Sequence, residues 1–193
     1  MSFAPQPDHG GSETLLLLAR LQRGDAGALE PLYRRESGPV YRYALALCND
    51  TAWAADAMHD AFVALAANPT GFDPLRGSLG AYLAGAARHS LLARWRESRR
   101  WVEETDGDDA MDERADAPEH WLARAQHQQA LWRAIQALAW PQREVLVLVD
   151  LQERNYVEAA HIAGIEINTL RTRLHRARAR LAALLEAGMG ASP

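Results

Sequence analysis

Apolar residues recur along most of this chain at the spacing of one helix face, about 3.6 residues. No segment shows the alternation, with a period of two, that predicts a half-buried strand. Alanine is abundant and aromatic residues make up only 7% of the chain, which favours helices over strands. The pattern predicts an all-α fold with helices at residues 13–23, 25–36, 39–48, 51–67, 78–100, 119–138, 141–152, 156–163 and 168–186.

The breaks between these helices predict two small helical domains, at residues 13–100 and 119–187. Residues 101–118 between them are rich in acids and have no apolar periodicity, which predicts a flexible linker. The segment 1–12 is rich in proline, glycine and serine, so we expect it to be disordered. A short tail, 188–193, ends the chain.

The last two predicted helices, with Gly164 between them, have the layout of a helix-turn-helix, whose second helix can enter the DNA major groove. In the second helix Leu170, Leu174, Ala177, Leu181, Leu184 and Leu185 form one apolar stripe, and Asn168 or Thr169 can cap its start. In the first helix Val157, Ala160 and Ile162 are the expected core. The alternative is an amphipathic helix with a solvated basic face. The expected DNA contacts are Asn168, Thr169, Arg171, Thr172, Arg173, His175 and Arg176.

A second basic stretch ends the predicted helix at 78–100, which Ser78 can cap. Leu79, Leu83, Ala86 and Leu91 are its expected core. Beyond them arginines alternate with tryptophan, a combination that suits single-stranded DNA because guanidinium groups bind phosphates and rings stack on unpaired bases. A basic helix end beside an acidic linker is the alternative. The candidate residues are Arg88, His89, Arg94, Trp95, Arg96 and Arg99.

The helix at 51–67 has an apolar stripe of Met58, Ala61, Phe62 and Leu65. Its other side carries acids beside a tryptophan, which is a candidate surface for docking another protein, since aromatic residues are favoured interface anchors. A solvated acidic face is the alternative. A metal site at Asp56, His59 and Asp60 is a weaker one, because these three lie on a single exposed helix face. The candidate docking residues are Trp53, Asp56, His59, Asp60 and Val63.

Charge is strongly segregated along the chain. The net charge of −4 argues against a general nucleic-acid binder. However, residues 88–100 carry five arginines and one acid, residues 171–180 carry five arginines and no acid, and residues 103–119 carry nine acids and one arginine. We expect the acidic run to repel DNA phosphates and so to suppress non-specific DNA binding by the free protein.

Several function classes find no support in the sequence. Cys48 is the only cysteine, which excludes a disulfide framework and a cysteine-based zinc site. There is no glycine-rich phosphate loop and no readable nucleophile–base pair, so we expect no enzyme. The N-terminus lacks the features of a signal peptide, and the apolar run 15–18 is too short to span a bilayer, which favours the cytoplasm.

Taken together, these patterns resemble the extracytoplasmic-function (ECF) group of bacterial RNA polymerase sigma factors, over residues 13–186. The C-terminal half is the more specific match, to the family's region 4, and the N-terminal half resembles region 2. In the C-terminal half the matching positions are Ala137-Leu138, Arg143-Glu144-Val145-Leu146, Tyr156, Glu158-Ala159-Ala160 and Thr169 to Arg178. In the N-terminal half they are Asp25, Ala28-Leu29, Leu32-Tyr33-Arg34-Arg35, Asp56 to Phe62, Phe72-Asp73-Pro74, Arg76 to Leu79 and Tyr82-Leu83.

The resemblance implies a promoter-specificity subunit that binds core RNA polymerase and promoter DNA, with no cofactor, no metal and no small-molecule substrate. Region 2 would bind the polymerase clamp and open the −10 element, region 4 would read the −35 element, and the linker would thread the polymerase cleft. The chain departs from the family pattern at His59-Asp60 (usually Gln-Glu), Tyr82 (usually Trp), His89 (usually Asn) and Ala93 (usually Asp). The Leu-Pro expected before the helix at 141 is Leu138-Ala139, followed by Pro141.

The helix-turn-helix is compatible with two kinds of protein, which differ in their oligomeric state and in how they bind DNA. A sigma factor is expected to be a monomer when free of its partners, and the family often has an anti-sigma protein as a further partner. A stand-alone transcriptional regulator would dimerise and bind duplex DNA at two half-sites about one helical turn apart.

Overall fold

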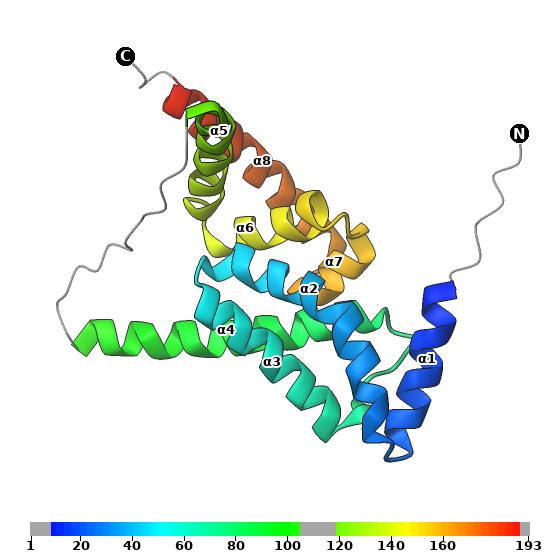
Figure 1. Cartoon of the computed structure of the whole chain (residues 1–193). Helices are drawn as coiled ribbons and strands as arrows, with labels where there is room; N and C mark the ends of the chain where they lie inside the picture. The colour runs from blue at the N-terminus through cyan, green and yellow to red at the C-terminus, as the bar shows by residue number, and fades with distance from the viewer. Residues whose placement is uncertain (1–8, 105–118, 190–193) are drawn as a thin grey trace, which may run out of the picture. The chain divides into compact units, whose positions relative to one another are not determined.

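The computed structural model describes residues 9–104 and 119–189, and within them every regular element is a helix (Figure 1). The predicted all-α fold is confirmed in this part of the chain. The elements are α1 (His9–Gln22), η1 (Ala26–Ala28), α2 (Leu29–Cys48), α3 (Thr51–Ala67), η2 (Pro69–Gly71), α4 (Leu79–Glu104), α5 (Glu119–Gln136), α6 (Trp140–Leu146), η3 (Val147–Leu151), α7 (Tyr156–Ala163) and α8 (Ile167–Met189).

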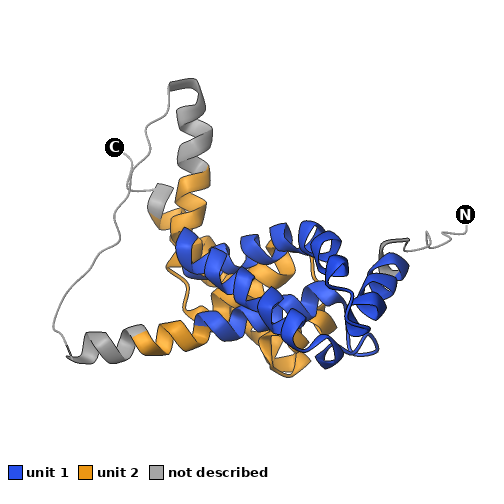
Figure 2. Cartoon of the chain, turned by 60° about the horizontal axis from the view of Figure 1, so that its bottom comes forward, with its two compact units in different colours: residues 1–91 blue, residues 92–193 orange. Residues whose placement is uncertain are grey.

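The chain forms two compact units, residues 1–91 and residues 92–193 (Figure 2). The division falls inside α4, and the domain boundaries at residues 100 and 119 stay predictions. None of the helices in the described ranges is both long and apolar enough to cross a membrane.

The first unit is built on α2 and α3, which lie side by side (Figure 1). Apolar side chains of both helices are buried, as are those of Leu79, Leu83 and Leu91 in α4. Tyr33 and Phe62 add a tilted ring contact, with centroids 4.8 Å apart and planes at 55°. The buried core includes Leu32, Val40, Tyr43, Leu47, Ala54, Ala57, Ala61, Phe62, Leu65, Leu83 and Leu91.

Local hydrogen bonds fix where these helices begin. The carboxylate of Asp50 accepts from the backbone N–H of Trp53 at 2.8 Å and starts α3. The hydroxyl oxygen of Ser78 accepts from the N–H of Ala81 at 3.2 Å, which confirms the predicted cap of α4.

The predicted break between the helices 25–36 and 39–48 is wrong: residues 29–48 form one helix, α2, and the first part of the predicted helix, Ala26–Ala28, is the separate 3-10 helix η1. Proline inside a helix removes one backbone hydrogen bond. Here Pro39 is followed by the buried side chains of Val40 and Tyr43, and their burial offsets that loss. Pro31 lies in the first turn of α2, where a missing N–H leaves no helical bond unmade.

Two other predicted boundaries need correction. α1 begins at His9, so the prediction of disorder over 1–12 is wrong for residues 9–12, and 1–8 lie outside the described residues. α4 continues to Glu104, so the predicted linker is helical at 101–104. The rest of that linker, 105–118, and the end of the tail, 190–193, also lie outside the described residues.

The second unit packs α5, α6, α7 and α8 around a separate core. The predicted helix 141–152 begins at Trp140 and changes at Val147 from an α-helix to a π-helix, η3. Such one-turn π segments are rare and shift the register of the side chains that follow. The buried core of this unit includes Ile135, Leu138, Val145, Leu146, Leu148, Ile162, Leu170 and Leu174.

Candidate nucleic-acid interface

The predicted helix-turn-helix is formed by α7 and α8. The side chain of Asn155 caps α7 by accepting from the N–H of Glu158 at 2.9 Å. The helix ends at Ala163 and is followed by Gly164, whose φ of +64° is the left-handed conformation that glycine adopts without strain. Ile165 N–H then donates to the carbonyl of Ala160 at 3.0 Å and closes the turn that leads into α8.

The inner faces of the two helices form the core of this motif. Leu170, Leu174 and Ala177 are each at most 2% exposed, which confirms the first part of the predicted stripe. Further along α8 the stripe is only half-buried, at Leu181, Leu184 and Leu185. In α7, Ala160 and Ile162 are buried as predicted.

One predicted core residue of α7 is wrong: Val157 is 66% exposed. Ala159, Ala160, Ile162 and Ala163 define the buried face of this helix. At about 100° per residue, Val157 lies far from the centre of that face. The helical spacing of Val157 from Ala160 was therefore insufficient to place it inside.

The outer face of α8 carries the predicted DNA contacts. At about 100° per residue, Asn168, Thr172, His175 and Arg176 lie opposite the buried leucine stripe. The other predicted contacts lie towards the two edges of this face, Arg171 on one edge and Thr169 and Arg173 on the other. Six of the seven are exposed and Arg173 is half-buried, so one helix face presents the whole set.

The predicted cap of α8 is wrong. The helix begins at Ile167, so Asn168 and Thr169 lie inside its first turn. There the Asn168 side-chain oxygen accepts from Arg171 Nη1 at 3.3 Å, and the Thr172 hydroxyl donates to the Asn168 carbonyl at 3.0 Å. These contacts order the start of the outer face.

One feature of this face was missed from the sequence: Asp150 of η3 binds Arg178 of α8 in a two-pronged ion pair. Arg178 Nε donates to Asp150 Oδ2 at 2.9 Å and Nη2 donates to Oδ1 at 2.5 Å. These hydrogen bonds raise the pKa of Arg178 above its ordinary value. The two residues are far apart in sequence and Asp150 belongs to the π turn, so no helical spacing indicates their contact.

On α3, the candidate docking residues share the exposed side of the helix. Asp56, His59 and Asp60 are exposed, Val63 is 54% exposed and Trp53 is half-buried. Within the described residues no group of three or more His, Cys, Asp or Glu side chains is arranged to hold a metal ion.

Asp60 also has a partner that the sequence did not indicate. Its carboxylate accepts a hydrogen bond from the hydroxyl of Ser90, in α4, at 2.6 Å. The exposed face of α3 is therefore joined to α4 directly beside His89. Any substitution of Asp60 removes this bond as well as the surface charge.

On α4, Leu79, Leu83 and Leu91 are buried as predicted, whereas Ala86 is half-buried. The predicted single-strand contacts follow these core positions along the helix. His89, Trp95 and Arg96 are exposed, with Trp95 at 39%, and Arg88 and Arg94 are half-buried. The side chain of Arg99 lies outside the described residues. His89 and Arg96 are seven residues apart and so lie close to one line along the helix.

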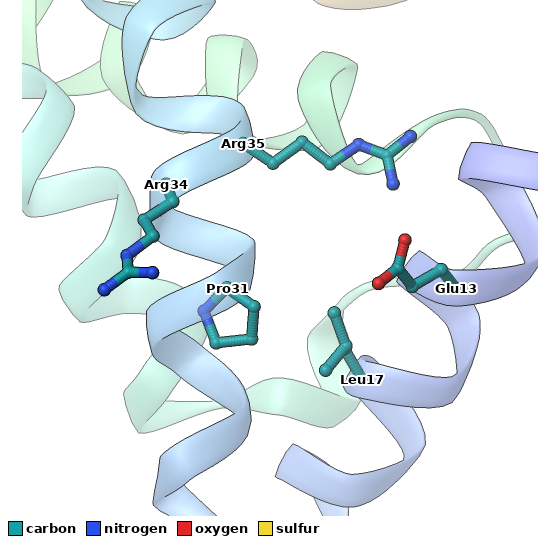
Figure 3. A pocket seen from close by; sticks show the side chains of 5 residues that line it. All are labelled: Glu13, Leu17, Pro31, Arg34 and Arg35. Carbon is teal, nitrogen blue, oxygen red and sulfur yellow. The ribbon is translucent and has the colours of Figure 1, made fainter.

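An open groove of about 300 Å³ lies between α1 and α2 (Figure 3). It is lined by Glu13 and Leu17 of α1 and by Pro31, Arg34 and Arg35 of α2. Figure 3 shows Arg35 extending towards α1 and Arg34 turned away. Arg34 forms an ion pair with Glu30, and Arg35 Nε lies 3.7 Å from Glu36 Oε1, so both arginines of the groove have acidic partners within the protein.

Comparisons with known families agree with both halves of this arrangement. Residues 32–101 match Sigma-70 region 2, and residues 128–181 match Sigma-70, region 4. The first range covers α3 and most of α2 and α4, and the second covers the helix-turn-helix.

Curated relatives align over most of the chain. The ECF RNA polymerase sigma factor BldN of Streptomyces coelicolor is 30% identical over 94% of this chain and 69% of its own length. The ECF RNA polymerase sigma factor EcfG of Rhodopseudomonas palustris is 30% identical over 74% of this chain and 77% of its own length.

Solved structures show the same fold. The sigma factor RpoE of Bartonella quintana, in complex with the anti-sigma factor NepR, has a TM-score of 0.64 and 26% identity, over 91% of this chain and 95% of that one. CnrH, in complex with the cytosolic domain of CnrY, has a TM-score of 0.65 and 25% identity, over 91% of this chain and 98% of that one.

Proposed function

Because the chain belongs to the extracytoplasmic-function sigma factors of RNA polymerase, we propose that it binds core RNA polymerase and directs initiation at a dedicated set of promoters. The observation that carries this proposal is the outer face of α8, where one helix presents six exposed polar or basic side chains opposite a buried leucine stripe. A helix of this kind can enter the major groove of the −35 element.

The position of each side chain on α8 suggests its role. Asn168, Thr172, His175 and Arg176 occupy the middle of the outer face and would meet base edges at the floor of the groove. Arg171 and Arg173 lie towards its edges, where the phosphate backbones run. Arg176 is the only arginine among the residues in the middle of the face, and its fork can donate to O6 and N7 of a guanine together. It is therefore best suited to read a guanine.

The residues on α4 would capture the opened −10 element. Trp95 is 39% exposed beside the ring of Trp140, and its exposed surface would stack on an unpaired base, a contact worth about 1–3 kcal/mol. His89 and Arg96 are exposed on the same helix, and Arg88, Arg94 and Arg99 would add charge for the single-strand backbone. Extruding a base costs only a few kcal/mol, so a small number of such contacts can hold a melted strand.

The exposed side of α3 would dock on core polymerase. Trp53 and Val63 provide apolar contact area, and Asp56, His59 and Asp60 provide polar groups around it. Interfaces of this type depend on a few aromatic anchors surrounded by polar residues. The domain limits proposed for these roles are 13–100 for the −10 and polymerase-binding part and 119–187 for the −35 part.

Further partners follow from the same assignment. Two similar proteins were solved in complex with other proteins, one named as an anti-sigma factor and one as the cytosolic domain of CnrY, which supports an anti-sigma protein as a partner here. Polymerase and promoter are both cytoplasmic in bacteria, which supports that location for this chain. In this proposal the factor performs no catalysis, and its work is binding.

The test is selection of promoters by the reconstituted holoenzyme. The purified chain is mixed with core RNA polymerase and transcribes a library of random upstream sequences. We expect transcripts to depend on the chain and to share two upstream sequence elements. Transcripts without a shared element, together with a dimeric free protein that binds duplex DNA at paired half-sites, would favour the stand-alone regulator instead.

A further inference from the structure

The ion pair between Asp150 and Arg178 lies on the same side of α8 as part of the proposed DNA face. Arg178 follows Arg171 by seven residues, so at about 100° per residue the two lie close to one line along the helix, with His175 beside it. In the ion pair the side chains of Arg178 and Asp150 keep 52% and 30% of their surface exposed. Arg178 therefore lies at the edge of the DNA face while bound within the protein.

The geometry of the pair leaves Arg178 able to bind a second anion. A guanidinium has five N–H donors, and Asp150 accepts from only Nε and Nη2. Tyr156 also forms a side-chain hydrogen bond with Arg178, so two of the three remaining N–H groups are left for another acceptor. Because a planar guanidinium held on one side cannot rotate freely, its remaining donors point in a fixed direction. A phosphate that meets it finds donors already oriented.

The carboxylate also has an opposing effect. Asp150 places a negative charge near the DNA face, which repels phosphates wherever the helix lies on DNA. This repulsion is the same for every sequence, whereas an oriented guanidinium helps most when the helix is seated in its correct register. The pair is therefore suited to raise the ratio of specific to non-specific binding rather than affinity alone.

We propose that Arg178 is a further DNA-binding residue, which contacts a backbone phosphate beside the −35 element, and that Asp150 is a positioning residue that orients it. This inference rests on the proposed function of α8. It adds a phosphate contact to the edge of the face that Arg171 occupies. It also assigns a role to η3, since the π turn carries the carboxylate that binds Arg178.

The experiment measures binding of the holoenzyme to two short duplexes at several salt concentrations. One duplex carries the −35 sequence selected with the wild-type holoenzyme, and the other carries a scrambled version. We expect Arg178→Ala to weaken specific binding by about tenfold and to lower the slope of log affinity against log salt by about 0.9, the value for one phosphate contact. Arg178→Lys should keep the slope and lose part of the affinity.

Asp150→Ala separates orientation from charge. We expect it to strengthen binding to the scrambled duplex, because a negative charge is lost, and to lower the ratio of specific to scrambled affinity. Arg180→Ala is the matched control, since Arg180 is an exposed arginine of α8 that lies away from Asp150 on the helix. The double variant Asp150→Ala with Arg178→Ala should be non-additive, whereas Asp150→Ala with Arg180→Ala should be additive.

The outcomes separate this inference from the function on which it rests. If the wild-type holoenzyme does not distinguish the two duplexes, the −35 assignment of α8 is wrong and the inference falls with it. If it distinguishes them but Arg178→Ala keeps the full salt slope, Arg178 touches no phosphate and only this inference is overturned. An unchanged specificity ratio in Asp150→Ala would remove the positioning role. Thermal melting of each variant identifies any loss that reflects unfolding.

Discussion

α4 and α8 both carry clustered arginines, but the two helices hold them in different ways. On α8 the basic face lies directly opposite a buried stripe of Leu170, Leu174 and Ala177, so packing of the helix fixes where each arginine points. On α4 the last buried residue in the described part is Leu91, and most of the arginines follow it. The basic end of α4 thus lies past the core of the first unit, and there Trp95 contacts Trp140 of α6 within the second unit, with ring centroids 6.4 Å apart.

This difference fits the two kinds of DNA assigned to the helices. Reading base edges in a duplex needs side chains held at fixed positions along a groove. Holding a melted strand needs charge and aromatic surface, and it tolerates varied geometry because every base has a face that can stack. A rigidly packed helix suits the first task, and a helix end beyond its core suits the second.

The largest expected effect comes from breaking the packing that fixes α8. Leu174→Ala removes a side chain that is 2% exposed, and we expect a loss of about 2–5 kcal/mol in the free energy of unfolding of the second unit. Denaturant unfolding followed by circular dichroism measures it. Leu185→Ala, at a half-buried position of the same helix, is the control and should cost clearly less. Equal losses in the two variants would mean that the stripe does not anchor the helix.

Polymerase docking is expected to be sensitive to α3 and insensitive to α8. The double variant Trp53→Ala with Asp60→Arg should weaken binding of core polymerase by at least about tenfold, since truncation of an interface hot-spot residue costs about 2 kcal/mol or more. Fluorescence anisotropy of the labelled factor titrated with core polymerase measures this affinity.

The control for this double variant is Ser90→Ala, which removes the hydrogen-bond partner of Asp60 but leaves the exposed face of α3 intact. We expect this variant to bind core polymerase within about twofold of wild type, the range of a surface substitution. A double variant that binds normally while its melting temperature is unchanged would remove this face from the proposal.

Sequence discrimination tests the duplex-reading side of the comparison. Arg176→Ala should lose about 1–3 kcal/mol of discrimination at one base pair of the −35 element, if its fork reads a guanine. Arg171→Ala and Arg173→Ala, at the edges of the face, should weaken binding to all sequences more evenly. Transcription from promoters with single −35 substitutions measures both effects. Uniform weakening by Arg176→Ala would assign it to phosphate instead.

Promoter opening tests the α4 side. Trp95→Ala should destabilise the open complex by about 1–3 kcal/mol, the contribution of one stacked base, with little change in −35 discrimination. Permanganate reactivity of unpaired thymines reports the opening. Trp132→Ala, which removes an equally large and partly exposed ring from α5, is the control and should open promoters normally. Equal behaviour of the two variants would contradict a stacking role for Trp95.

The smallest expected effect lies away from both DNA faces. Asp25 caps η1 at Gly27 N–H, 3.0 Å away, and pairs with Arg20 at 2.7 Å. The hydrogen bond from Arg20 lowers the pKa of Asp25 below its usual value. The ionised Asp25 carboxylate therefore stabilises the folded state above the unfolded-state pKa of this residue. The contribution is lost as the pH falls through the folded-state pKa.

For this exposed residue the effect on stability should be slight. Asp25→Asn should melt slightly below wild type at neutral pH, and the difference should shrink in acid, below about pH 3.9, the ordinary pKa of an aspartate. Thermal melting at the two pH values measures it, with no change in promoter selectivity. A difference that grows in acid would show that the carboxylate does not carry the stabilisation.

Much of the fold followed from the sequence, because helical periodicity and local caps are short-range signals. Ser78, Gly164 and the stripe through Leu174 were all placed correctly from spacing and residue type alone. The merger of two predicted helices across Pro39 was not, because burial of the residues after the proline outweighs its local preference. Val157 was misplaced since its spacing from Ala160 fits a helix face only approximately.

The side-chain contacts between helices could not be predicted from the sequence. Asp60 with Ser90 and Asp150 with Arg178 each join residues about thirty positions apart. No regular spacing in the sequence indicates either pair. The second pair also depends on a π turn, which no residue pattern predicts. The candidate faces could thus be identified from type and spacing, whereas the bonds that orient them required the folded structure.

The division of labour between α4 and α8 is tested most directly by mapping where each helix meets the promoter. A photo-crosslinking amino acid is placed at His175 in one variant and at His89 in another, both exposed positions, and each holoenzyme is bound to a selected promoter. We expect position 175 to crosslink to the duplex of the upstream element and position 89 to the melted strand of the downstream element. Crosslinks from both positions to the same element, or from neither to DNA, would contradict the account.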